Sequence, residues 1–300
     1  MSEPETATVA DPTYGFRRLD PLPAADELDR FYQSAYADMV RRGERFPELR
    51  RMFEGGEDAE LERTWMHATL HADLLDSLDQ NLAVGAERSL LDIGSGQGEL
   101  LESAAKAGWR AMGLEPSVEA VELGTAQGRT IEAATFEEYV ARAEVPSPPT
   151  AITLTNVLEH VPDPIGLLVS IHEFLDEGSL VAIRVPNDFN PLQAEVRRVL
   201  GHRAWWVAAP DHINYFDHAT LAAAVRGTGF EVCDQWADFP MEMLVLMGDD
   251  YVADPAAGKV AHERRRRWEL AIDTSTRRAL AKALVPLGWG RNTIVVARVV

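Results

Sequence analysis

The 300-residue sequence has a single cysteine, Cys233, and its apolar runs are short. One thiol excludes intrachain disulfides and a cysteine-rich metal cluster. A membrane helix needs roughly 20 consecutive apolar residues, so we expect no spanning segment and no membrane partner. The chain begins MSEPETATVADPTYG, which is acidic and polar and therefore atypical of a signal or transit peptide. These features favour a cytoplasmic protein.

The sequence also lacks an excess of positive charge. Its 29 Lys and Arg residues are outnumbered by 48 Asp and Glu residues, which gives a formal net charge of −19 at pH 7. A strongly negative protein repels the phosphates of nucleic acids, so we expect no nucleic-acid partner. The one arginine-rich run, HERRRRWEL from His262 to Leu270, is interpreted as the solvated face of a long helix balanced by nearby acids. A local anion site is the alternative.

The spacing of apolar residues changes near residue 88. Before it the periodicity is helical, as in AELERTWMHATLHADLLDSLDQNL, and after it short apolar strands alternate with helices. This alternation predicts an α/β fold, a mainly parallel sheet with helices on both faces. The seven expected strands are Ser89–Ile93, Arg110–Leu114, Thr130–Ile131, Ala151–Thr155, Leu180–Arg184, Phe230–Ala237 and Thr293–Val299. The expected helices between them are Glu99–Ala107, Val118–Gln127, Phe136–Ala143, Pro164–Leu175 and His218–Gly227.

We place a helical N-terminal extension at residues 1–85 and the α/β domain at residues 86–300. Two segments of that domain, 187–217 and 241–290, are longer than ordinary connections. Long connections in compact domains are commonly binding loops or lids. We expect a substrate loop in the first segment, and in the second a helical lid or a contact within a homodimer.

A glycine-rich turn follows the first of these strands, in SLLDIGSGQGELLES. Gly94, Gly96 and Gly98 are spaced G-x-G-x-G, and Glu99 stands where a dinucleotide fingerprint needs its third glycine. The Gly-Lys-Ser/Thr of a P-loop is also missing. The next strand ends GLEP, where the Glu115 carboxylate can accept hydrogen bonds from both hydroxyls of a ribose. The pattern predicts a nucleoside cofactor with a cationic or zwitterionic tail and no cradled phosphate.

Taken in order, LLDIGSGQGELL, GLEPS and ITLTNVLEHVPDP resemble the motif series of class I S-adenosylmethionine-dependent methyltransferases. The resemblance is close from Leu90 to about Leu175. Further on, VPNDFNPLQ, DHINYFDHATLAAAVRGTGFEV and GWGRNTIVVARV are similar to the small-molecule branch, which includes ubiquinone-type and sugar or antibiotic O-methyltransferases. The resemblance implies a Rossmann-like fold with an N-terminal helical cap, S-adenosyl-L-methionine as cofactor and a small-molecule acceptor.

Carried onto matching positions, the resemblance implies a cofactor site drawn from four strand ends. The residues are Asp92, Gly94, Ser95, Gly96 and Gly98 at the methionine portion, Glu115 and Pro116 at the ribose, Thr135 and Phe136 at the adenine edge, and Asn156, Val157 and Leu158 beneath the sulfonium. For Thr135 and Phe136 the alternative is a helix cap followed by a core aromatic.

Two histidines are candidate catalytic bases. A hydroxyl nucleophile must lose its proton, and histidine is the usual base near neutral pH. His160 follows the fourth expected strand in LEHVP, and His212 lies in DHINYF within the substrate loop. The alternatives are a backbone-bonding support for His160 and a loop-anchoring hydrogen bond, with Asp211, for His212.

Aromatic residues are candidate acceptor contacts, because aromatic rings supply large contact areas. They are Trp205, Trp206, Tyr215 and Phe216 in the substrate loop, and Tyr32 and Tyr36 in the N-terminal region. The alternative for each is core packing. Asp163 and the pair Asp249–Asp250 are metal ligands by residue type alone, without ligand spacing, so we assign no metal site.

The sequence therefore predicts an enzyme that moves a methyl group to a hydroxyl of a small molecule, such as a secondary metabolite, a sugar or a quinone-like acceptor. Two alternatives stay open. One is N- or C-methylation on the same fold, and the other is a non-catalytic protein that binds S-adenosylmethionine.

Overall fold

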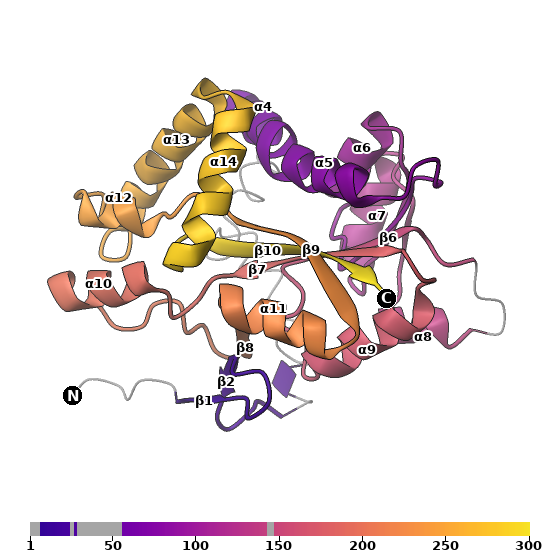
Figure 1. Ribbon diagram of the computed structural model, residues 1–300. Helices are drawn as coiled ribbons and strands as arrows, with labels where there is room; N and C mark the ends of the chain where they lie inside the picture. The colour runs from indigo at the N-terminus through magenta and orange to yellow at the C-terminus, as the bar shows by residue number, and fades with distance from the viewer. Residues whose placement is uncertain (1–6, 25–26, 29–55, 143–146) are drawn as a thin grey trace.

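A seven-stranded sheet forms the centre of the computed structural model, which describes residues 7–24, 27–28, 56–142 and 147–300 (Figure 1). The strand order is β5-β4-β3-β6-β7-β10-β9. Neighbouring strands from β5 to β7 are parallel, and β10 is antiparallel to both its neighbours. The strands are β3 (Ser89–Ile93), β4 (Arg110–Leu114), β5 (Ile131–Glu132), β6 (Ala151–Thr155), β7 (Leu180–Pro186), β9 (Phe230–Ala237) and β10 (Asn292–Val299). The predicted α/β fold with a seven-stranded, mainly parallel sheet is confirmed.

Helices cover both faces of this sheet, which explains the continuous apolar runs of its strands. Successive side chains of a strand point to opposite faces, so Leu90 and Leu91 of β3 lie in different core clusters. The helices α8 (Phe136–Val140), α9 (Pro164–Phe174) and α11 (His218–Gly227) supply one cluster. The helices α5 (Ala72–Asn81) and α6 (Glu99–Lys106) supply the other, on the upper face in Figure 1. Helix α7 (Val118–Ala126) lies between β4 and β5 in the chain.

The N-terminal region is helical only in part. Helix α4 (Gly56–Met66) continues through a π-helical turn, η2 (His67–His71), into α5. Two short strands come first, β1 (Thr8–Ala10) and β2 (Arg17–Leu19), and β2 pairs with β8 (Asn214–Tyr215) in a small antiparallel sheet. The expectation of helix throughout residues 1–85 is therefore wrong at β1 and β2. Three-residue strands are too short to show a period, and their partner lies far along the chain.

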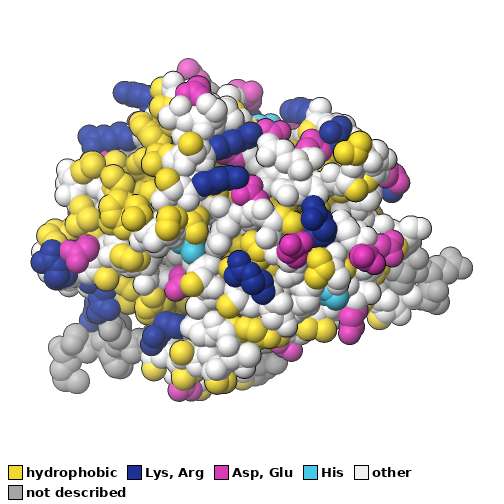
Figure 2. Space-filling view, in the orientation of Figure 1, with side chains coloured by type: hydrophobic (Ala, Val, Ile, Leu, Met, Phe, Trp, Pro, Cys, Tyr) yellow, Lys and Arg dark blue, Asp and Glu magenta, His cyan; other side chains and the backbone are white. Residues whose placement is uncertain are grey.

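The two long segments carry helices of their own. Residues 187–217 contain α10 (Pro191–Leu200), which begins with a capping box between Asn190 and Gln193. Residues 241–290 contain α12 (Glu242–Leu246), α13 (Pro255–Ala271), α14 (Thr274–Leu284) and the 3-10 turn η3 (Val285–Leu287). Apolar side chains gather on the surface over α12 and α13 (Figure 2), and Leu246, Met247 and Val260 are exposed there.

The arginine-rich run lies on α13 and is not simply a solvated face. Arg265 and Arg266 are buried, whereas Arg264 and Arg267 are exposed. The buried pair is balanced by acids as expected, but these acids are buried too and lie on other elements as well as on α13. Of the described helices, none is long and apolar enough to span a membrane.

Candidate active site

The glycine-rich turn joins β3 to α6 at the carboxyl edge of the sheet, the edge at which open α/β sheets bind ligands. Gly94 has a φ of 69° and Gly96 a φ of 54°, a region that residues with side chains rarely adopt. A Cβ on Gly94 would lie 2.7 Å from Cγ2 of Val157, whereas one on Gly96 would meet nothing within 4 Å. The turn thus packs its backbone against the loop after β6 and leaves open space at its centre.

Asp92 lies under this turn, near the end of β3. Its side chain is 3% exposed, and the Thr153 hydroxyl donates to its Oδ1 at 2.6 Å. Burial raises the pKa of Asp92 to about 7, with the Glu115 carboxylate adding to the effect and the Thr153 hydrogen bond opposing it. The carboxyl group is therefore protonated at a higher pH than an exposed aspartate.

Glu115 connects the end of β4 to the glycine turn. Its Oε2 accepts from the Gly96 N–H at 2.9 Å, and its Oε1 accepts from the Ser117 N–H at 2.8 Å. Burial raises its pKa, and the two backbone donors oppose that shift. Pro116 follows as an exposed turn residue. Each carboxylate oxygen has a second lone pair, so Glu115 retains acceptor capacity for ligand hydroxyls.

Thr135 and Phe136 have structural roles at the start of α8. The Thr135 hydroxyl accepts from the Glu138 N–H at 3.2 Å, and the Glu138 carboxylate accepts from the Thr135 N–H at 2.8 Å, which completes a capping box. Phe136 is 2% exposed, and its ring meets Phe174 edge-on at 5.6 Å. Helix cap and core aromatic are thus both observed, and a contact with adenine stays a prediction.

The loop after β6 faces the glycine turn. Asn156 has a φ of 58°, and its N–H donates to the Arg184 carbonyl at 2.8 Å. Val157 packs against Gly94, as described above. Leu158 is fully buried in the core cluster beneath α9. Val157 therefore borders the turn, Asn156 is held by Arg184 of β7, and Leu158 lies in the core.

The two candidate bases come together. The imidazole rings of His160 and His212 lie 4.9 Å apart at 84°. Nδ1 of His160 is 3.0 Å from Oδ1 of buried Asp211 and 3.0 Å from the Asp211 carbonyl, while Nε2 of His212 is 4.0 Å from Oδ2 of Asp211. Burial alone would lower the pKa of His160, but the carboxylates of Asp211 and Glu159 outweigh it and raise the pKa.

Glu159 is a site residue that the sequence reasoning missed. It is 1% exposed, its Oε1 lies 3.9 Å from Nε2 of His160, and burial raises its pKa. Ligand atoms of Glu159, His160 and His212 all lie within 4.8 Å of one another, a donor set that could hold a divalent cation. The adjacent Glu-His pair was visible in the sequence, but its proximity to His212 depends on the fold.

The predicted aromatic cluster separates into different roles. Phe216 is 1% exposed and stacks on Phe16 at 4.7 Å, so it is a core residue. Trp205 packs edge-on against buried Trp206 at 4.8 Å. Tyr215 lines a cavity of about 170 Å³, and its hydroxyl donates to the His212 carbonyl at 2.6 Å. Tyr32 and Tyr36 lie outside the described residues.

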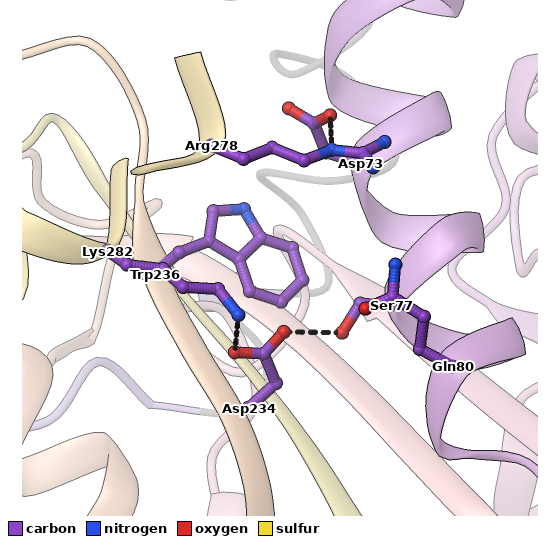
Figure 3. Close-up of a pocket in the computed structure, with 7 residues that line it drawn as sticks. All are labelled: Asp73, Ser77, Gln80, Asp234, Trp236, Arg278 and Lys282. Atoms are coloured by element: carbon purple, nitrogen blue, oxygen red, sulfur yellow. Dashed lines mark hydrogen bonds and ion pairs between the residues drawn. The ribbon is translucent and has the colours of Figure 1, made fainter. Parts of the chain in front are cut away.

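A smaller cavity, of about 40 Å³, lies between α5, β9 and α14 (Figure 3). Asp234 accepts from Ser77 at 2.9 Å and pairs with Lys282 at 2.8 Å, while Arg278 pairs with Asp73. These charges satisfy one another, and the residues that line this cavity are not among those predicted for the site.

Comparison with known proteins decides the family. The profile described as "Methyltransferase domain" matches residues 64–235. The chain is a class I S-adenosylmethionine-dependent methyltransferase. The ubiquinone biosynthesis O-methyltransferase of Aromatoleum aromaticum is 30% identical to it over 190 residues, 59% of this chain and 78% of that protein. The enzyme of that name from Burkholderia ambifaria is 29% identical over 161 residues, 50% of this chain and 67% of that protein.

Solved structures share the methyltransferase's fold at low sequence identity. The 1,6-didemethyltoxoflavin-N1-methyltransferase of Burkholderia thailandensis has a TM-score of 0.50 at 14% identity and covers 99% of this chain and 97% of its own. The [4+2]-cyclase SpnF has a TM-score of 0.51 at 14% identity, with coverages of 93% and 97%. Because a cyclase has this fold too, the fold alone does not determine the reaction.

The methyltransferase's cofactor is S-adenosylmethionine, which supplies an activated methyl group when bound. The residues at the glycine turn fit it. Gly96 leaves open space, Glu115 retains acceptor capacity, and the Ser95 hydroxyl is buried without a hydrogen-bond partner among the described residues. Asp92 and Glu115 are the two carboxyl groups that would lie at its methionine portion and at its ribose.

Proposed function

We propose that this methyltransferase acts on a hydroxyl group of a small molecule and that His212 takes the proton. The observation that carries the proposal is the pair of imidazole rings, 4.9 Å apart, beside the loop that follows β6. The O-methyltransferase relatives, at about 30% identity, support a hydroxyl acceptor.

The two histidines would have different roles, with His160 orienting its neighbours and His212 accepting the proton. Nδ1 of His160 faces Asp211 and its Nε2 faces Glu159, so both of its ring nitrogens lie near protein carboxylates. An imidazole held in this way orients its neighbours. We assign the contact with the acceptor to His212, because Nδ1 of His160 lies 3.0 Å from the Asp211 carboxylate, whereas Nε2 of His212 lies 4.0 Å from it. Its imidazole would accept the hydroxyl proton as the methyl group is transferred.

The remaining residues would bind, orient and exclude water. Asp92, Glu115 and the backbone of the glycine turn would hold the cofactor, and Asn156 and Val157 would border the reacting centre. Since the cofactor already carries the activation, positioning supplies much of the rate.

The test is turnover of S-adenosylmethionine with a panel of hydroxylated acceptors. We expect His212→Ala to lower kcat about 10²- to 10⁴-fold, the usual contribution of a general base, with cofactor affinity unchanged. His172→Gln is the matched control, because His172 lies on α9 and packs against Phe230 of β9, away from the site. Unchanged turnover in His212→Ala would contradict His212 as base, and turnover with amine acceptors alone would indicate N-methylation.

A further inference from the structure

The cavity of about 170 Å³ is separate from the cofactor residues. It is bounded by the turn before β2, by Asp188 and Phe189 after β7, by Tyr215, and by the first turn of α11. An engineered protein cavity of about 150 Å³ holds one benzene molecule. A space of this size accommodates a single six-membered ring.

Phe189 forms one wall at the cost of backbone strain. Its φ is 57°, which is unusual for a bulky residue. Its ring stays 36% exposed, although Trp206 and Tyr215 meet it edge-on at 5.5 and 5.8 Å and the Arg17 guanidinium lies 4.8 Å from its centre. Strained residues that neighbouring contacts hold in place are concentrated at ligand sites. These contacts fix the ring so that one side is available to a ligand.

Asp188 is the buried carboxyl group among the polar residues that line this cavity, which also include Arg17, Asp217 and Thr220. It is 6% exposed, and its Oδ1 accepts one long hydrogen bond, from Gln193 at 3.3 Å. Burial, with the nearby carboxylates of Glu242 and Glu159, raises its pKa to about 7, while the Gln193 hydrogen bond opposes the shift. When protonated, this carboxyl group can donate a hydrogen bond to a ligand hydroxyl, and when ionised it can accept one.

The cavity is connected to the histidine pair. The Tyr215 hydroxyl donates to the His212 carbonyl, and the Asp188 N–H donates to the Phe216 carbonyl at 2.8 Å. A ring bound here would thus lie against Tyr215, whose hydroxyl bonds the backbone of the proposed base.

We infer that this cavity is the acceptor subsite and that it takes one six-membered ring bearing a hydroxyl group, with the ring on Phe189 and the hydroxyl on Asp188. The inference rests on the proposed function. A phenol and a sugar share this chemistry, so the probes are phenol, methyl glucoside and anisole, whose oxygen carries no hydrogen. Ligand-observed NMR on the full chain without cofactor detects weak binding of each.

We expect phenol or methyl glucoside to bind at least tenfold more tightly than anisole. Asp188→Asn and Phe189→Gly should each weaken that binding at least tenfold. Glycine accepts a positive φ, so Phe189→Gly should melt within a few degrees of the unchanged protein. Glu62→Gln is the control, because Glu62 is a buried carboxyl that pairs with His262 and Arg266 and does not line the cavity, and it should bind as before.

The inference would be overturned if neither phenol nor methyl glucoside bound. It would also be overturned if Asp188→Asn and Phe189→Gly both bound the probe as tightly as the unchanged protein. So would a Phe189→Gly variant that loses stability and retains the probe. Cofactor affinity and turnover are measured on the same samples. Turnover of hydroxylated acceptors without ring binding here overturns the subsite alone, whereas ring binding without such turnover overturns the proposed function and leaves the subsite.

Discussion

The guanidinium of Arg184 donates from Nη1 to the side-chain oxygen of Asn156. The Arg184 carbonyl accepts from the Asn156 N–H as well, so β7 holds the loop after β6 by both backbone and side chain. Asn156 keeps a φ of 58° within these bonds. The residue expected beneath the reacting centre therefore depends on its neighbouring strand for its conformation.

Arg184 is one end of a network of hydrogen-bonded charged side chains. Its Nη2 lies 3.4 Å from Oδ2 of Asp238, which also accepts from Arg265 at 3.1 Å. Arg265 donates to Glu269 at 3.0 Å, and Glu269 accepts from the Trp65 indole at 2.7 Å. This network of side chains connects α4 and α13 to the loop that carries Asn156. Removing one partner from such a network leaves a buried charge uncompensated.

We predict that Arg184→Lys weakens cofactor binding about tenfold or more. Lysine keeps the charge but lacks the planar fork that reaches Asn156 and Asp238 together, and a hydrogen bond to a charged group contributes about 1.5–3 kcal/mol. Arg266→Lys is the control, since Arg266 pairs with Glu62 and does not contact Asn156. Calorimetric titration of both variants is the measurement, and equal losses in the two would contradict the prediction.

Glu115→Gln should weaken cofactor binding about 10- to 100-fold while the protein stays folded. The amide keeps the size of the carboxylate but loses the charge that strengthens its bonds to ribose hydroxyls. It also has one acceptor oxygen, so it can accept from only one of the Gly96 and Ser117 N–H groups. The exposed Glu122 of α7 provides the matched substitution, Glu122→Gln, which should bind the cofactor normally. Dissociation constants from titration and melting temperatures separate lost affinity from lost structure.

Asp92 predicts a dependence of stability on pH. Its pKa is about 7 in the folded protein against an ordinary 3.8, so between these values the folded state holds a proton that the unfolded chain has released. The corresponding stability is present below pH 4 and lost as pH rises through 7; its full size is about 4 kcal/mol. Asp92→Asn removes the titration, and its amide oxygen can still accept from Thr153. Between pH 5 and pH 8, denaturant unfolding should show the free energy of unfolding of Asp92→Asn rising relative to that of the unchanged protein. An equal difference between the two proteins at both pH values would refute this account.

Much of the sheet was predictable because its strands are short apolar runs bounded by turn residues. β3, β4, β6 and β9 have the predicted bounds, and β5, β7 and β10 differ by at most two residues. The pairing of β2 with β8 was not predictable, because a three-residue strand depends on its partner for its hydrogen bonds. The burial of Arg265 was missed for a similar reason, since its acid Asp238 lies on another element.

The candidate site was predictable where local sequence determines geometry. Glycines mark the turn after β3, and the sequence predicts both His160 and His212 as candidate bases, although only the fold brings their rings within 4.9 Å. A bond between Asp211 and His212 is the alternative to a catalytic His212, and the Asp211 carboxylate lies 4.0 Å from His212 and 3.0 Å from His160. The positive φ of Phe189 leaves no trace in the sequence, because the contacts that hold it come from distant segments.

The close packing of the glycine turn gives the last prediction. Gly94→Ala must place a Cβ at a φ of 69° and 2.7 Å from Val157, so it combines left-handed strain of about 1–2 kcal/mol with overpacking of about 1–3 kcal/mol. Gly128→Ala, at a φ of 81° with nothing within 4 Å, carries the strain alone. Unfolding free energies should therefore fall further for Gly94→Ala than for Gly128→Ala. Adding Val157→Ala should recover part of the unfolding free energy lost in Gly94→Ala and none of that lost in Gly128→Ala. Similar recovery in both variants would show that contact with Val157 is not what destabilises Gly94→Ala.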